Sequence, residues 1–149
     1  MSYEQLKLEN QLCFPFYAVS RLIIRAYQED LDKLGITYTQ YLVLMILWEK
    51  NEQSVNEIAE KLILNTNTVT PLLKRMELMG LLVRKPSGKD QRKVIVGLTT
   101  IGQELQHAAA QIPLNLTQKF IQREPESHLS DLLMLKNQLN SILSILKNK

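Results

Sequence analysis

The segment 64–77 constrains this chain more than any other part of it. It opens with hydroxyl and amide side chains and continues with helical spacing. Its apolar residues recur at steps of three and four: Val69, Leu72, Leu73 and Met76. This spacing predicts a helix that buries one face and ends at Gly80, with Lys74 and Arg75 on its outer side. A helix of this design can offer its polar face to a groove in nucleic acid.

Positive charge is concentrated in the same part of the chain. Between Lys74 and Lys93 there are seven basic residues and two acidic ones, a net charge of +5. The whole chain has a net charge of +3, so the remaining residues together carry −2. A charge run is usually a solvated helix face, but a positive charge confined to one segment is the electrostatic footprint of nucleic-acid binding.

The flanking segments predict a winged helix. Two capping-box patterns start the two preceding helices, at Thr37-Tyr38-Thr39-Gln40 and Ser54-Val55-Asn56-Glu57. A strand, a turn and a second strand follow the basic helix, at 81–85, 86–91 and 94–98. We therefore expect a helix-turn-helix and a basic hairpin within a winged-helix core at 37–98, with the wing at about 82–98.

Long helices with an apolar face are predicted at both ends of the chain. In the first, the spaced apolar residues are Leu12, Phe16, Val19, Ile23, Tyr27, Leu31 and Leu34. Because proline is best tolerated at the start of a helix, we expect this one to begin at Pro15, just after Cys13, and to end at Gly35. The two ends, 1–35 and 100–149, carry more apolar surface than a small winged helix can cover. This surplus predicts a homodimer.

Size and composition fit one domain spanning residues 1–149. No apolar run reaches the roughly 18 residues of a membrane span, and we see no secretory signal. Cys13 is the only cysteine, which suits a reducing cytoplasm. His107 and His128 have no cysteine or carboxylate cluster at metal-ligand spacing, and no phosphate loop or catalytic motif is found. We therefore expect no metal, no cofactor and no enzymatic activity.

Four motifs, in order over nearly the whole chain, resemble the MarR-type winged-helix regulators. They are Leu12-Cys13-Phe14 with Tyr17, Leu34-Gly35-Ile36-Thr37-Tyr38-Thr39-Gln40-Tyr41 with Leu47-Trp48-Glu49, Thr68-Val69-Thr70-Pro71-Leu72-Leu73-Lys74-Arg75-Met76-Glu77, and Asp90-Gln91-Arg92 with Leu98-Thr99. Within the family the chain is most similar to the one-cysteine organic-peroxide sensors of the OhrR branch. The resemblance implies a mainly helical fold with a small β-hairpin wing. It also implies dimerisation through the terminal helices and binding of double-stranded DNA at a pseudo-palindromic operator.

The residue types of the winged helix predict its DNA contacts. Hydroxyl and amide groups can read base edges in the major groove, whereas Lys74 and Arg75 would contact phosphates. In the wing, Arg92 suits a narrow minor groove, and Asp90 could hold its guanidinium in place. The residues predicted to bind DNA are Thr66, Asn67, Thr68, Thr70, Pro71, Lys74, Arg75, Lys89, Asp90 and Arg92.

Cys13 has two interpretations. A lone cysteine among apolar neighbours is most often a buried hydrophobe. Its place ahead of a helix N-terminus, whose dipole favours a thiolate, argues for reactivity instead. The resemblance implies that Cys13 is a peroxide-reactive cysteine surrounded by Tyr17, Tyr27 and Tyr38, the last two from the partner subunit. The phenols would donate hydrogen bonds to the thiolate.

Under this hypothesis an organic hydroperoxide converts Cys13 to a sulfenic acid, which then reacts with a small cellular thiol or is oxidised further. The change would disturb the first helix, move the recognition helices and release a repressor from DNA. Three alternatives remain open. The first is a MarR-type repressor released by a small aromatic ligand, the second is a thiol-based enzyme that consumes peroxide, and the third is a protein–protein adaptor that reuses the winged helix.

Overall fold

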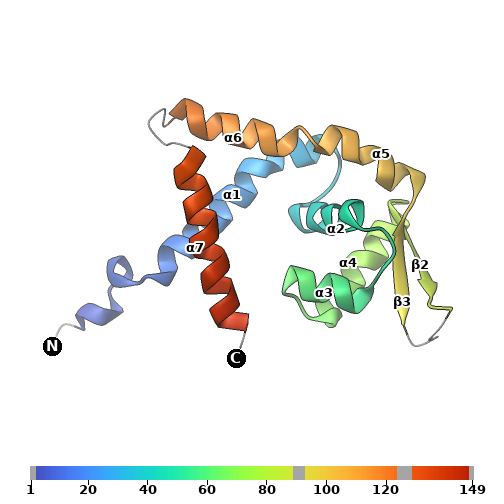
Figure 1. Cartoon of the computed structure of the whole chain (residues 1–149), viewed down its shortest axis with the longest axis horizontal. Helices are drawn as coiled ribbons and strands as arrows, with labels where there is room; N and C mark the ends of the chain where they lie inside the picture. The colour runs from blue at the N-terminus through green and yellow to red at the C-terminus, as the bar shows by residue number, and fades with distance from the viewer. Residues whose placement is uncertain (1–2, 89–92, 124–128, 148–149) are drawn as a thin grey trace. The chain divides into compact units, whose positions relative to one another are not determined.

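The computed structural model describes residues 3–88, 93–123 and 129–147, the side chains of 120–123 and 129 excepted (Figure 1). The chain forms two compact units, Met1–Ile112 and Pro113–Lys149. The first contains η1 (Glu4–Leu6), η2 (Leu8–Asn10), α1 (Cys13–Lys33), α2 (Tyr38–Glu49), β1 (Gln53–Ser54), α3 (Val55–Leu62), α4 (Thr66–Leu78), β2 (Leu82–Pro86), β3 (Val94–Leu98) and α5 (Thr100–Ala109). Helix α6 (Ile112–Arg123) leads into the second unit, where α7 (Leu129–Lys147) follows.

Both predicted capping boxes are confirmed. Thr37 and Gln40 exchange side-chain and backbone hydrogen bonds at the start of α2, with the Thr37 N–H donating to Gln40 Oε1 over 2.8 Å. Ser54 and Glu57 do the same at the start of α3. Each box satisfies backbone N–H groups that have no partner inside the helix, so these four residues fix where α2 and α3 begin.

Three helices end in the same hydrogen-bonded turn, which needs a residue in the left-handed region. Gly35 after α1 and Gly80 after α4 hold that position, at φ 68° and 72°, as the sequence predicts. After α3 the position belongs to Ile63, at φ 56°. Its N–H donates to the Glu60 carbonyl, and the next N–H donates to the carbonyl of Ala59. Because a β-branched residue is strained there, the turn between α3 and α4 stores conformational energy.

A three-stranded antiparallel sheet in the order β1-β3-β2 closes the winged helix. The hairpin is predicted at 81–85 and 94–98, and the structure has it at Leu82–Pro86 and Val94–Leu98. The short strand β1 is not predicted, because two residues carry no periodic pattern. Helices α2, α3 and α4 pack against the sheet around a common core that includes Leu44, Leu47, Ile58, Leu73, Met76, Leu82 and Val96.

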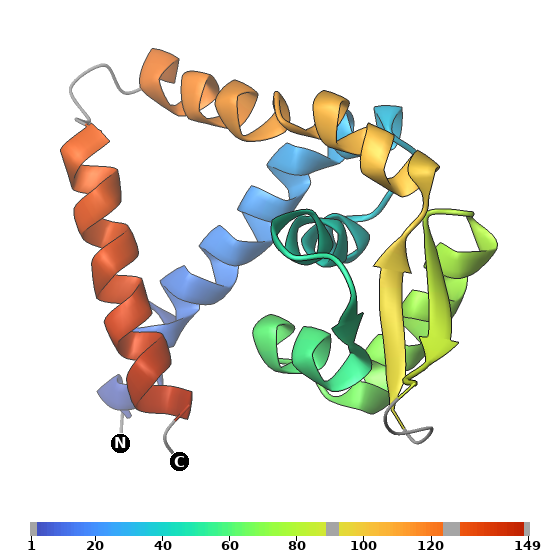
Figure 2. The ribbon, with the colours of Figure 1, turned by 45° about the vertical axis from the view of Figure 1, so that its right-hand side comes forward.

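Helix α1 begins earlier than the sequence predicts. It starts at Cys13 rather than Pro15, with Leu12 preceding it and no side-chain cap. Pro15 is thereby the third helical residue, where its missing N–H removes no hydrogen bond because the first helical N–H groups have no partner. Figures 1 and 2 show α1 extending away from α2, α3 and α4. Only Leu31, near its end, is buried.

The second unit carries a strongly apolar helix. Along α7, exposed apolar side chains include Leu132, Leu133, Met134, Leu135, Ile142, Leu143, Ile145 and Leu146. Among the described residues, no helix is both long enough and apolar enough to cross a membrane. The structure confirms the mainly helical fold with a small winged helix-turn-helix.

Candidate functional site

Helix α4 presents a polar face on the side opposite the core. Val69, Leu72, Leu73 and Met76 are buried, as the sequence predicts. Asn67, Pro71 and Lys74 follow each other at steps of four and three, which places them on the line farthest from that buried side. All three are exposed. The polar face of α4 can therefore enter a groove while its apolar face stays packed.

The other predicted contacts lie along the two edges of this polar face. Thr66, Thr68 and Arg75 are exposed and Thr70 is half-buried. Asn65 precedes the first helical residue, Thr66, and forms no side-chain cap. Because Pro71 lacks an N–H, the carbonyl of Asn67 loses the donor that an ordinary helical residue would supply. The start of α4 thus combines exposed hydroxyls and an amide with a backbone acceptor.

The wing rises from β2 and β3 beside α4. Its strands pair from Leu82 with Leu98 to Pro86 with Val94, and the Ser87 N–H closes the base by donating to the carbonyl of Lys93 over 2.7 Å. Lys85 and Lys93 are exposed at this base. The predicted wing residues Lys89, Asp90 and Arg92 lie outside the described residues.

Arg84, one of the basic residues between Lys74 and Lys93, faces inward. Arg84 lies on the same face of β2 as buried Leu82, and its guanidinium binds Glu77 of α4. The Nη2–Oε2 and Nε–Oε2 distances are 2.7 and 2.9 Å, and the Arg84 N–H also donates to Oε1 over 3.0 Å. The hydrogen bonds from the Arg84 side chain hold the pKa of Glu77 below its ordinary value. The sequence pattern includes both charges but does not predict that Glu77 and Arg84 form an ion pair.

Cys13 is exposed as the first residue of α1. Tyr17 lies one helical turn further along the same face and is 58% exposed. The guanidinium carbon of Arg21, four residues beyond Tyr17, lies 5.6 Å from the centre of the Tyr17 ring. Cys13, Tyr17 and Arg21 thus share one stripe of the helix. Their spacing of four could have predicted that Arg21 lies on the same stripe as Cys13 and Tyr17.

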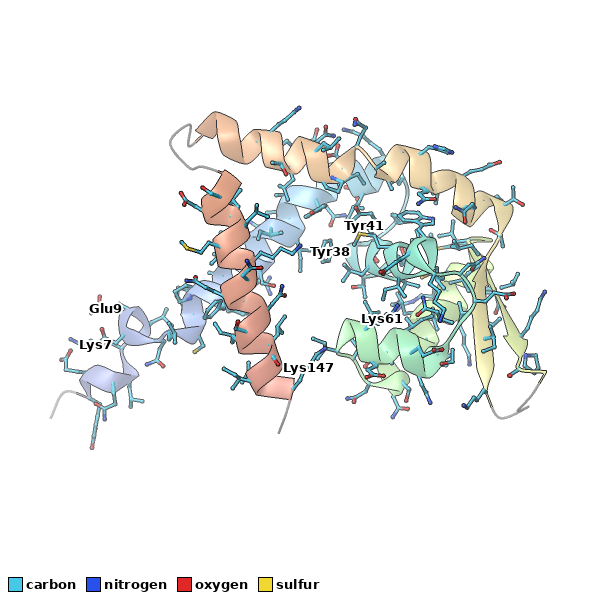
Figure 3. The ribbon with its side chains drawn as sticks, in the orientation of Figure 1. Lys7, Glu9, Tyr38, Tyr41, Lys61 and Lys147 are labelled. Atoms are coloured by element: carbon cyan, nitrogen blue, oxygen red, sulfur yellow. The ribbon has the colours of Figure 1, made fainter. Side chains whose placement is uncertain are left out.

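The other two predicted tyrosines lie in a separate aromatic cluster. The ring centres of Tyr27 and Tyr38 are 5.3 Å apart, and Tyr41 packs 6.1 Å from Tyr27 and 6.4 Å from Tyr38. Figure 3 shows Tyr38 and Tyr41 at the start of α2. Burial raises the pKa of all three phenols above the ordinary value of 10.0, so they stay protonated donors at neutral pH. Trp48 extends the cluster, 6.3 Å from Tyr41.

One chain does not bring the four predicted redox residues together. Cys13 and Tyr27 are fourteen residues apart on a single helix. At about 1.5 Å per residue they are separated by roughly 21 Å along its axis. A site containing Cys13 and Tyr27 therefore needs two chains. Among the described residues, no group of three or more histidine, cysteine or acidic side chains could hold a metal ion.

Comparison with known proteins identifies the family of this chain. The family model of the transcriptional regulators SarA/Rot matches residues 25–109. The organic hydroperoxide resistance transcriptional regulator of Bacillus subtilis is 43% identical over 99% of this chain and 97% of its own length. It is a relative of this chain, and its match extends from the first helix to the last.

Two solved structures of AbfR from Staphylococcus epidermidis are also similar. Reduced AbfR bound to DNA is 40% identical, with 98% of this chain and 99% of that chain covered and a TM-score of 0.79. Disulfide-formed AbfR is 38% identical, with 98% and 96% covered and a TM-score of 0.65. The fold, the family model and these identities agree along the chain. The chain belongs to the MarR/SarA family of DNA-binding winged-helix transcriptional regulators, which are not enzymes.

Proposed function

We propose that this protein is a homodimeric repressor that leaves its operator when an organic hydroperoxide oxidises Cys13. One observation carries the proposal. Cys13 is exposed at the start of α1, in a chain 43% identical to a regulator named for organic hydroperoxide resistance. The reducing cytoplasm would keep this thiol ready and would supply the small thiol that reacts with it afterwards.

The DNA contacts follow from the polar face of α4. Thr66, Asn67, Thr68, Thr70 and Pro71 meet base edges in the major groove, and Lys74 with Arg75 contacts phosphates. Lys89, Asp90 and Arg92 extend the contact to the minor groove through the wing. All described members of this set are exposed except Thr70, which is half-buried, and this exposure supports the proposal, as does the DNA-bound structure of AbfR.

Exposed apolar surface supports a dimer. Along α1 the exposed side chains include Leu12, Phe14, Phe16, Val19 and Leu22. Helix α7 in the second unit has its own exposed apolar residues. A monomer rarely leaves so many large apolar residues in water. A second copy that covers them places two α4 helices about a two-fold axis, which matches a pseudo-palindromic operator.

The oxidation is a two-electron step at one sulfur. The Cys13 thiolate attacks the terminal oxygen of the hydroperoxide, and the S–O bond forms as the O–O bond breaks. The organic part leaves as an alkoxide, which takes a proton from water and becomes an alcohol. Sulfur gives up the two electrons and becomes a sulfenic acid. A small cellular thiol then displaces water and forms a mixed disulfide with Cys13. The added group cannot fit the covered face of α1, so the subunits shift and DNA is released.

The tyrosines complete the site across the dimer. Tyr17 comes from the same chain as Cys13, one turn away. Tyr27 and Tyr38 come from the partner, because the distance along α1 keeps them from the cysteine of their own chain. Their raised pKa supports the proposal, since a protonated phenol can donate a hydrogen bond to the thiolate.

A DNA-binding titration tests the switch. The native protein and Cys13→Ser are titrated onto operator duplex with and without cumene hydroperoxide. We expect the hydroperoxide to abolish binding by the native protein and to leave Cys13→Ser bound. Sensitivity that persists in Cys13→Ser would remove the cysteine from the mechanism. Release by a phenolic acid but not by hydroperoxide would favour the aromatic-ligand alternative.

Mixed dimers test the shared site. We expect Tyr27→Phe and Tyr38→Phe to slow oxidation of Cys13, while Tyr41→Phe from the same cluster leaves the rate unchanged. A heterodimer of Cys13→Ser with the Tyr27→Phe, Tyr38→Phe double variant contains one intact site, in which cysteine and tyrosines come from different chains. This heterodimer should regain rapid oxidation. A heterodimer as slow as the tyrosine variant would contradict the exchange of tyrosines between subunits.

A further inference from the structure

An ion pair joins the recognition helix to the wing. Glu77 lies in the last turn of α4, and Arg84 is the third residue of β2. Three hydrogen bonds connect them: the guanidinium donates two to Oε2, and the Arg84 backbone N–H donates one to Oε1. The carboxylate is thus bonded to both the side chain and the backbone of one strand residue, which fixes the strand more firmly than a single contact at a flexible tip.

The position of this pair separates it from an ordinary surface ion pair. The side chains of Arg84 and Glu77 are only 22% and 34% exposed. Arg84 is paired with Val96 in the middle of β3, so a contact that fixes Arg84 also fixes the second strand of the wing. Its neighbours Val83 and Lys85 point outward. The guanidinium is therefore directed at α4 and away from the exposed side of the hairpin.

The pair also reduces the number of cations between Lys74 and Lys93 that can contact phosphate. Four of the described cations in this range are exposed: Lys74, Arg75, Lys85 and Lys93. Arg84 is partly buried against a carboxylate and is not presented to phosphate. A cation that is neutralised within the fold contributes to DNA binding through geometry and adds nothing to counterion release.

We propose that the Glu77–Arg84 ion pair sets the angle between α4 and the wing, so that the wing reaches the minor groove beside the major groove that α4 occupies. Both are positioning residues, since neither touches DNA. The inference rests on the proposed DNA binding. It predicts a division of effects: loss of the pair weakens the wing contact and leaves the contacts of α4 and the number of phosphate contacts unchanged.

The test uses Glu77→Gln and the Glu77→Gln, Arg84→Met double variant. The single variant keeps an oxygen for the Arg84 N–H and loses the negative charge. The double variant removes the pair without changing the net charge, so long-range electrostatics stay the same. The probe is the duplex that the native protein enriches from a random-sequence pool. The variants are compared at temperatures where thermal unfolding shows them fully folded.

We expect both variants to lose hydroxyl-radical protection in the minor grooves that flank the site, as we also expect of Arg92→Ala. Both should keep the native protection of guanine N7 in the major groove from methylation by dimethyl sulfate. Affinity should fall about tenfold, the size of one lost specific contact. For the charge-neutral double variant, the slope of log affinity against log salt should stay at the native value. Lys85→Ala provides the matched control, since a neighbouring exposed cation should lower the slope and leave the footprint pattern intact.

Three outcomes would overturn the inference. They are flanking protection retained by the double variant, equal loss of protection in both grooves, and a reduced salt slope of the double variant. Failure of the native protein to enrich any duplex would instead contradict the proposed function, so the two failures are distinguishable. If Glu77→Gln alone proves too unstable, the charge-neutral double variant decides the question, because it leaves no buried unpaired charge.

Discussion

The carbonyl oxygen of Leu81 occupies the space that a side-chain carbon would need at Gly102. Gly102 lies in the first turn of α5, where its N–H donates to Thr99 Oγ1 over 3.1 Å. Its carbonyl accepts a hydrogen bond from the Trp48 indole over 2.9 Å. The Thr99 hydroxyl in turn donates to the carbonyl of Gly80 over 2.6 Å. The end of α4, the start of α5 and α2 therefore meet at one glycine.

The first prediction concerns this junction. We expect Gly102→Ala to lower the free energy of unfolding by about 3 kcal/mol, because the added methyl overlaps backbone atoms that cannot move like a flexible side chain. Gly88→Ala is the control, since nothing lies within 4 Å of its added carbon, and it should stay within about 0.5 kcal/mol of the native protein. Urea denaturation measures both. Equal stability of the two variants would contradict the close approach.

The second prediction concerns the strained turn at Ile63. Glycine adopts its positive φ freely, whereas any side chain with a β-carbon is strained there. We expect Ile63→Gly to be about 1 kcal/mol more stable than Ile63→Ala in thermal or urea unfolding. At Glu60, an exposed site inside α3, the order should reverse, with alanine about 1 kcal/mol better than glycine. The same order at both sites would argue against the left-handed turn.

The third prediction concerns pH. Hydrogen bonds from the Ser54 side chain and backbone lower the pKa of Glu57 from its ordinary value of 4.5. A lowered pKa means that this stabilisation is complete above the ordinary value and is lost as pH falls through the lowered one. Ser54→Ala should therefore cost about 1 kcal/mol at pH 7 and less at pH 3.

Thr37→Ala is the control for the pH prediction. Its capping-box partner is Gln40, which does not titrate, so its cost in unfolding free energy should be the same at both pH values. Urea denaturation of the two variants at pH 7 and pH 3 makes the comparison. If the cost in unfolding free energy falls equally for Ser54→Ala and Thr37→Ala, a general effect of low pH on the protein, and not Glu57, is responsible.

The fourth prediction concerns the charge of α4. Lys74 lies on its polar face, so Lys74→Ala should lower the slope of log affinity against log salt by about 0.9, the effect of one phosphate contact. Lys136 of α7 is also exposed but lies in the second unit, and Lys136→Ala should leave the slope unchanged. Fluorescence anisotropy over a range of salt concentrations measures both. An unchanged slope for Lys74→Ala would remove this residue from the interface.

Local signals made most of the winged helix predictable. The capping boxes at Thr37 and Ser54 and the cap at Gly80 depend on residues a few positions apart, which a sequence displays directly. Strand β2 begins one residue later than the sequence predicts. The Leu81 N–H still donates to the carbonyl of Met76 in α4, so pairing with β3 starts at Leu82. Strand boundaries depend on the partner strand and are therefore less visible in a single segment.

Features that depend on contacts between elements were not predictable. Glu77 and Arg84 are close because α4 reverses into β2, and no spacing rule for one helix or one strand connects them. Ile63 contradicts its own conformational preference, so residue type points to glycine or asparagine where the structure has isoleucine. The identity of the proposed redox residues came from family resemblance, and their meeting across two chains stays a prediction.

The junction at Gly102 has a mechanical consequence. Helix α5 has ten residues and is about 15 Å long, so it can act as a stiff lever whose pivot is the close contact of Gly102 with the carbonyl of Leu81. A displacement of its far end, near Ala109, therefore rotates α5 about this contact and moves the last turn of α4. Ordinary packed cores absorb such displacements by changing rotamers. A pivot made of backbone carbonyls and a glycine has no rotamers to change, so it transmits the displacement with little loss.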